Sequence, residues 1–88
     1  MAKKRINAGV IGTGSLGVNH ARIYSGLECV DSLFLYDRIS ERAEAAAAGF
    51  GAKTCSGMED LLDQVDVVSV CTPASDHHDS VMKAFDRG

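Results

Sequence analysis

Short apolar runs alternate with longer amphipathic stretches along the chain. Four runs are predicted to form strands, at residues 6–11, 33–36, 52–55 and 65–71. The first is rich in β-branched side chains and is closed by Gly12. Runs that are apolar throughout are typical of strands covered on both faces. The run at 65–71 is the clearest of the four, and that at 52–55 is the weakest.

The stretches between these runs carry apolar residues at the spacing of helices. The first helix is expected from Ser15 to about Leu27. Its apolar stripe consists of Leu16, Ile23, Tyr24 and Leu27. The second helix is expected to begin at Ser40, which is a favourable N-cap residue, and to end at Gly49 or Gly51.

Two further helices complete the pattern. Ser56 and Glu59 have the spacing of a capping box, in which the two side chains bond reciprocally to the backbone of a helix start. Ser75 and Asp76 open a last helix that continues through Phe85. The chain therefore alternates strand and helix four times, which predicts an α/β domain with a parallel sheet and right-handed crossovers.

A glycine-rich turn follows the first predicted strand directly. The pattern GxGxxG is matched by Gly12-Thr13-Gly14-Ser15-Leu16-Gly17. Its first glycine makes a tight turn, its second lets a pyrophosphate approach the backbone, and its third lets the helix pack closely on the strand. Asp37 follows Gly17 by twenty residues, at the end of the second strand. Together these features predict a dinucleotide-binding turn.

Asp37 and Arg38 bear on which nicotinamide dinucleotide binds. A carboxylate at the end of the second strand accepts hydrogen bonds from the adenosine ribose hydroxyls and repels the 2′-phosphate of NADP. Asp37 therefore favours NAD. Arg38 leaves NADP open, because a guanidinium can pair with a 2′-phosphate or stack on adenine. A methyl donor or a flavin is a third alternative, since such ligands also use glycine-rich turns.

A second group of candidate residues follows the fourth predicted strand. It consists of Cys71, Thr72, Pro73 and His77. In an incomplete Rossmann sheet, doubly wound in the order 3-2-1-4, the first and fourth strands are neighbours, and ligands bind at their carboxyl ends. Thr72 and Pro73 are therefore expected beside the glycine turn. Cys71 is included with the cofactor-binding residues, although its thiol is interpreted as a small apolar filler.

With the glycine turn, Asp37 and this segment in place, the chain from about Ile6 onward resembles the N-terminal part of the Gfo/Idh/MocA oxidoreductases. Members show a strand that ends in Thr-Pro and is followed, after three residues, by a histidine, which Thr72, Pro73 and His77 match. The resemblance implies an NAD-binding domain, with NADP possible, of an enzyme that transfers a hydride to or from a sugar, polyol or sugar-nucleotide alcohol. It also implies that His77 lies near the nicotinamide, the alternative being a residue at the surface or the start of the last helix.

In that family the domain continues to a Glu-Lys-Pro motif with a catalytic lysine, and a substrate domain follows. Residues 1–88 contain neither. We therefore expect a truncated NAD-binding domain without catalytic residues, a substrate domain or activity of its own. The alternative is a non-catalytic module that holds a dinucleotide for sensing, because Rossmann folds host many functions.

Composition argues against other partners. A net charge of −3 provides no basic face for nucleic acid or an anionic membrane, and no apolar stretch approaches the roughly 20 residues of a membrane span. Cys29, Cys55 and Cys71 form neither a disulfide framework nor a zinc spacing, which favours the cytoplasm. His77 and His78 are adjacent, so on a helix they point about 100° apart. No metal site is expected.

The fourth strand is expected at an edge of the sheet. Residues 67–71 contain no lysine or proline that would discourage pairing with another strand. The sequence therefore predicts self-association, with a two-fold dimer as the expected form, unless the last helix covers this edge.

Overall fold

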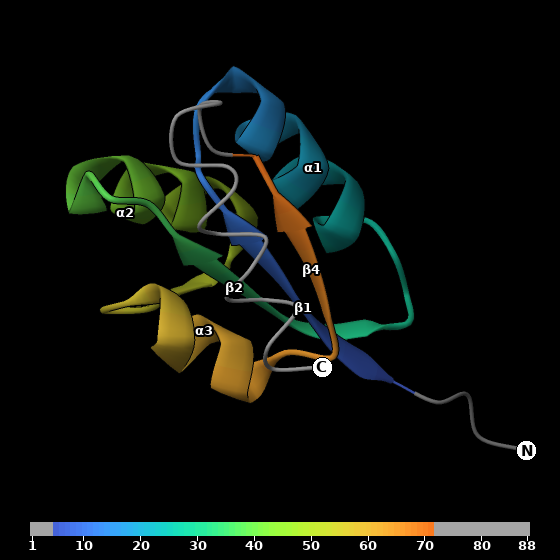
Figure 1. Ribbon diagram of the computed structural model, residues 1–88. Helices are drawn as coiled ribbons and strands as arrows, with labels where there is room; N and C mark the ends of the chain where they lie inside the picture. The colour runs from blue at the N-terminus through green and yellow to red at the C-terminus, as the bar shows by residue number, and fades with distance from the viewer. Residues whose placement is uncertain (1–4, 72–88) are drawn as a thin grey trace, which may run out of the picture.

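The computed structural model describes residues 5–71, in which strands and helices alternate (Figure 1). The strands are β1 (Ile6–Ile11), β2 (Val30–Tyr36), β3 (Lys53–Thr54) and β4 (Val67–Val70). The helices are α1 (Ser15–Ser25), α2 (Ser40–Phe50) and α3 (Met58–Gln64). The strands pair in parallel in the order β3-β2-β1-β4. The predicted fold class, with strand order 3-2-1-4, is confirmed.

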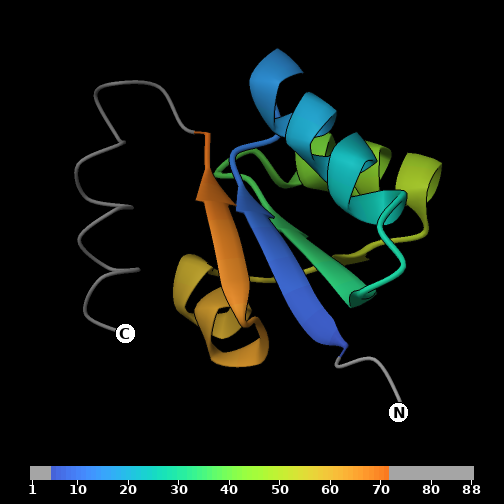
Figure 2. The same cartoon turned by 90° about the vertical axis from the view of Figure 1, so that its right-hand side faces the viewer.

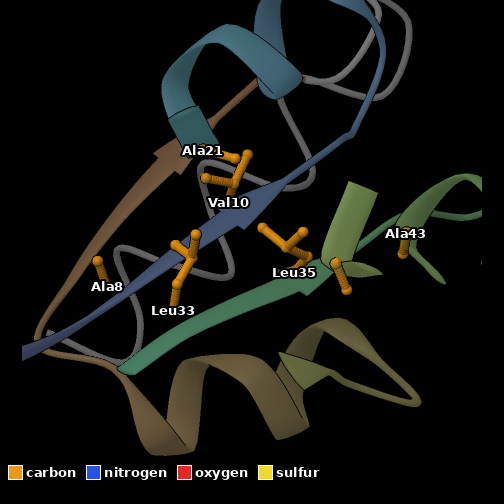
Figure 3. Close-up of a cluster of buried hydrophobic side chains, with 7 residues drawn as sticks. Ala8, Val10, Ala21, Leu33, Leu35 and Ala43 are labelled. Carbon is orange, nitrogen blue, oxygen red and sulfur yellow. The ribbon is translucent and has the colours of Figure 1, made fainter. Parts of the chain in front are cut away.

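Helices cover both faces of the sheet. α1 and α2 lie on one face, and α3 lies on the other (Figures 1 and 2). The first face carries a buried cluster, drawn in Figure 3, of Ala8, Val10, Ala21, Leu33, Leu35, Ala43 and Ala47. The opposite face carries a second cluster of Ile11, Phe34, Leu61 and Leu62. Successive residues of β1 and β2 therefore enter different clusters, which explains why these strands are apolar throughout.

The face of α1 that packs on the sheet differs from the predicted stripe. Gly17 and Ala21 are buried, whereas Leu16 and Ile23 are more than half exposed. A Cβ added to Gly17 would lie 1.7 Å from the carbonyl oxygen of Gly12. The helix approaches its own preceding turn so closely that small residues must face the sheet. Leu16 and Ile23 therefore lie exposed, whereas Tyr24 packs against the first cluster.

Neither predicted side-chain cap forms. α2 begins at Ser40, but Ile39 occupies the N-cap position, and its side chain makes no capping hydrogen bond. α3 has Gly57 at its N-cap, also without a side-chain hydrogen bond. Ser56 therefore lies one residue before the cap and Glu59 one residue too early in the helix, so the reciprocal bonds of a capping box are out of register.

β2 begins three residues earlier than predicted. Val30 pairs with Ile6 and Ser32 pairs with Asn7, with a register shift between these pairs. Asp31 and Ser32 are polar, so a search for apolar runs does not include this part of the strand. β3 and β4 are shorter than their predicted runs, and the last predicted helix lies outside the described residues.

Hydrogen bonds between side chains join α1 to β4. The Ser69 Oγ lies 3.1 Å from Nδ1 of His20 and 2.9 Å from the hydroxyl of Tyr24. His20 and Tyr24 therefore both connect α1 to the same residue of β4. At the other end of β4, the N–H of Asn7 donates to Oδ2 of Asp66 at 2.8 Å. These contacts hold the strand beside β1 at both ends.

Candidate cofactor-binding site

The candidate site is built around the turn between β1 and α1. Gly12 has a φ of 95°, a conformation that favours glycine. Its N–H donates to the carbonyl of Tyr36, at the end of β2, at 2.7 Å. A Cβ added to Gly14 would meet no atom within 4 Å. The turn is therefore tied to the neighbouring strand, and it leaves open space where a ligand can approach the backbone at Gly14.

The start of α1 leaves its backbone N–H groups available to an anion. Gly14 is the N-cap residue, no side chain bonds to the cap, and the first turn has no acidic residue. By contrast, the first turn of α2 contains Glu41, and that of α3 contains Glu59 and Asp60. A helix N-terminus carries a partial positive charge that attracts phosphate groups. The start of α1 therefore fits the pyrophosphate of a dinucleotide.

Asp37 lies against the glycine turn. The N–H of Thr13 donates to Oδ2 of Asp37 at 2.7 Å, and the hydroxyl of Thr13 donates to the same oxygen at 2.9 Å. The other oxygen, Oδ1, accepts from the N–H of Ile39 at 2.8 Å. The carboxylate is thereby fixed between the turn and the start of α2. Thr13 is buried, with 5% of its surface exposed.

These contacts determine the protonation of Asp37. Partial burial acts to raise the pKa of its carboxyl, but hydrogen bonds from Thr13 and Ile39 and the charge of Arg42 outweigh it, so the pKa lies below its ordinary value. Asp37 is therefore a carboxylate at neutral pH. A carboxylate accepts hydrogen bonds from hydroxyl groups and repels phosphate.

A groove lies beside the turn, between α1 and α2. It has a volume of about 520 Å³, and its lining includes Thr13, Gly14, Ser15, Val18, Arg42 and Phe50. Sequence reasoning missed Arg42, although its place in the first turn of α2, five residues after Asp37, was a usable signal. Its charge acts on the Asp37 carboxylate from this groove.

The remaining predicted site residues divide into two groups. Arg38 is exposed at the end of β2, next to Asp37. Cys71 follows β4, and its N–H donates to the carbonyl of Ile11 at 2.7 Å, which places the end of β4 beside the start of the glycine turn. Burial raises the pKa of the Cys71 thiol, so it is uncharged near neutral pH. Thr72, Pro73 and His77 lie outside the described residues.

Residues 5–71 contain neither a metal-binding cluster nor a membrane-spanning helix. No three His, Cys, Asp or Glu side chains in this range gather closely enough to hold a metal ion. No helix in this range has the length and apolar character needed to cross a membrane.

Comparison with known proteins places the chain among oxidoreductases. The model of the Gfo/Idh/MocA oxidoreductase family, NAD-binding Rossmann fold, matches residues 6–88. The chain is 38% identical over 72 residues to UDP-N-acetylglucosamine 3-dehydrogenase from Acidithiobacillus ferrooxidans, covering 82% of this chain and 22% of that protein. It is 32% identical over 94 aligned positions to inositol 2-dehydrogenase 4 from Saccharopolyspora erythraea, covering 100% of this chain and 27% of that protein.

Solved structures show the same arrangement. That of the Acidithiobacillus ferrooxidans UDP-N-acetylglucosamine 3-dehydrogenase superposes with a TM-score of 0.85 at 34% identity, over 98% of this chain and 28% of that one. GenD2 from gentamicin A biosynthesis, in complex with NAD, superposes with a TM-score of 0.88 at 27% identity, over 99% of this chain and 26% of that one. The chain thus spans about a quarter of the length of these relatives.

Proposed function

Because this chain belongs to the Gfo/Idh/MocA oxidoreductase family and has its NAD-binding Rossmann fold, we propose that residues 12–17 and Asp37 hold the adenosine and pyrophosphate part of NAD. The observation that carries this proposal is the pair of hydrogen bonds from Thr13 to Asp37, which unites the glycine turn and the ribose-binding carboxylate at the start of α1. In this arrangement the pyrophosphate contacts the N–H groups of the turn, and a ribose hydroxyl donates to Asp37.

We assign the other predicted residues to the rest of the same cleft. Arg38 lies beside the adenosine, where its guanidinium can pair with a 2′-phosphate. NADP is therefore the second candidate cofactor. Cys71 borders the glycine turn, and we propose that Thr72 does so too and that Pro73 directs the chain past the cofactor. His77 lies toward the nicotinamide, an assignment supported by the family pattern. When bound, NAD supplies a nicotinamide ring that accepts or donates a hydride.

For the whole protein we propose hydride transfer to or from an alcohol of a sugar, polyol or sugar nucleotide. The names of two relatives, UDP-N-acetylglucosamine 3-dehydrogenase and inositol 2-dehydrogenase, support this class of substrate. The chain matches about a quarter of each relative. We therefore propose that residues 1–88 form a truncated cofactor-binding domain, and that the substrate-binding and catalytic groups belong to a larger protein. We further propose that this protein acts in the cytoplasm.

Thermal unfolding with each cofactor tests the cofactor assignment. A ligand at a hundred times its Kd stabilises by about 2.7 kcal/mol, so NAD should raise the Tm by several degrees, and NADP should raise it less. Asp37→Ala should weaken NAD binding by about tenfold or more, because a hydrogen bond to a charged group is lost. Asp31→Ala, at an exposed carboxylate on β2, is the matched control. Equal protection of the unaltered chain by NAD and NADP would refute the assignment.

Assays of turnover test the proposal that residues 1–88 bind the cofactor but contain no catalytic group. Purified residues 1–88 should reduce no NAD with inositol, glucose or a UDP-sugar above a protein-free control, because hydride transfer needs a placed acid–base group and a substrate site. Measurable turnover would show that the chain contains its own catalytic group.

A further inference from the structure

The carboxylate of Asp37 has few acceptor positions left for a ligand. Two carboxylate oxygens offer about four lone-pair positions in their plane. Oδ2 receives two donors from Thr13, and Oδ1 receives one from Ile39. Of the four positions, the one remaining is on Oδ1. The contacts within the protein therefore determine which oxygen, and which direction, is offered to a bound nucleotide.

The donors that bond to the Asp37 carboxylate are of two kinds, backbone N–H groups and one side-chain hydroxyl. Both N–H donors belong to the backbone and are present whatever the side chain, whereas the Thr13 hydroxyl depends on residue type. The position between the first two glycines of a GxGxxG turn is open to many residues. Here that position holds a buried hydroxyl, 5% exposed, whose donor is directed at the residue that contacts the ribose in the proposed function.

We propose that the Thr13 hydroxyl is a specificity-determining positioning group, which orients the Asp37 carboxylate so that NAD is preferred over NADP. This inference rests on the proposed function of Asp37 as the ribose acceptor. Thr13 acts through Asp37 and makes no side-chain contact with the cofactor. Without the Thr13 hydroxyl, the Asp37 carboxylate keeps its two backbone donors but loses one of the two hydrogen bonds that fix Oδ2, so it can rotate more freely. The positive charge of Arg42, which lines the groove beside the same turn, then offsets more of the repulsion between Asp37 and the 2′-phosphate of NADP.

The test measures the affinities of the purified chain for NAD and NADP by calorimetric titration. Thr13→Val removes the hydroxyl at almost constant shape and should lower the NAD-to-NADP affinity ratio by roughly three- to tenfold. Thr13→Ala removes the same hydroxyl without a branched side chain and should act in the same direction. Thr13→Ser should keep the unaltered ratio. Thr54→Val makes the same chemical change on the exposed strand β3, so it should also keep that ratio.

A double-mutant cycle separates positioning from a general structural effect. If Thr13 acts through Asp37, adding Thr13→Val to Asp37→Ala should leave the affinity ratio of Asp37→Ala unchanged. Carboxyl NMR titration supplies a second measurement: Thr13→Val should raise the pKa of Asp37, and Thr13→Ser should not.

Each failure has its own signature. If the unaltered chain shows no preference for NAD, the proposed role of Asp37 fails, and this inference fails with it. If the unaltered chain prefers NAD and Asp37→Ala abolishes the preference, but Thr13→Val and Thr13→Ala keep it, only the inference about Thr13 is overturned. An equal effect of Thr13→Val with and without Asp37 would also overturn it.

Discussion

Asp37 connects three parts of the fold through one side chain. Its oxygens bond to Thr13 in the glycine turn and to Ile39 at the start of α2, and the charge of Arg42 acts on it from α2. The spacing of Asp37 from the glycines was visible in the sequence. Its bond to the hydroxyl of Thr13 was not, because the two residues are 24 positions apart and any residue type is allowed at position 13.

The low pKa of Asp37 predicts a pH dependence of stability. A carboxyl whose pKa is lower in the folded than in the unfolded chain stabilises the fold above its unfolded pKa, and that contribution is lost as the pH falls through the two values. Asp37→Asn should therefore lower the free energy of unfolding at pH 7, and the difference should shrink below about pH 4. Urea unfolding between pH 7 and pH 3 measures this.

Asp31→Asn is the matched control for that series. Asp31 is exposed and forms a 3.5 Å ion pair with Arg5, so its loss should cost less than about 1 kcal/mol. A difference for Asp37→Asn that stays constant or grows toward acidic pH would contradict the assigned role of its charge.

The three cysteines should differ in reactivity. Burial, together with the charge of Asp60, raises the pKa of Cys55 to about 11, so roughly one molecule in a thousand carries its thiolate at pH 8. Burial also raises the pKa of Cys71, whereas Cys29 is exposed. A disulfide reagent at pH 8 should therefore modify Cys29 first, and all three should react alike in 6 M urea. Equal rates in the folded chain would contradict this order.

At the scale of elements, the contact between α1 and its preceding turn shapes the first βα unit. The glycine pattern predicted a close approach at Gly17, and the structure contains it. Of the apolar stripe predicted for α1, Tyr24 packs against the first cluster, but Leu16 and Ile23 are exposed, because the hydrophobic spacing does not reveal how near a helix lies to its sheet. When the two are this close, the buried face contains Gly17 and Ala21, and Leu16 and Ile23 lie outside.

Two substitutions to alanine test this contact. Gly17→Ala places a Cβ 1.7 Å from a backbone oxygen, so it should cost more than about 3 kcal/mol or prevent folding. Gly49→Ala meets no atom within 4 Å in α2, and it should stabilise by about 0.5–1 kcal/mol through helix propensity. Urea unfolding, followed by circular dichroism, measures both. Similar small effects of the two substitutions would show that α1 can move away from β1.

At the scale of the whole molecule, the sheet ends at β3 and β4 within the described residues. β3 is two residues long and contains Lys53, which makes it a poor template for another strand. β4 is longer, and it contains neither lysine nor proline. Its outer backbone groups are therefore the more exposed to pairing, unless residues beyond Cys71 cover them.

We expect this edge to cause self-association of the chain. Sedimentation at tens of micromolar should show a dimer, and Val68→Lys should shift it toward the monomer, because a charged side chain on an edge strand disfavours pairing. Lys53→Gln on the opposite edge is a control that should leave the dimer unchanged. A monomer in the unaltered chain, with no change in Val68→Lys, would show that the edge is covered.

The sequence alone determined the order of elements from β1 to β4, the parallel sheet, the glycine turn and the position of Asp37. These follow from local patterns: apolar runs of strand length, amphipathic spacing, and glycines where a turn needs them. The tertiary structure decided which face α1 buries, where α3 begins, and which donors hold Asp37. The bonds from Thr13 join the glycine turn to a residue 24 positions away, and the face that α1 buries depends on how closely this helix packs on its own preceding turn. Neither a remote contact nor a packing distance can be read from a local pattern.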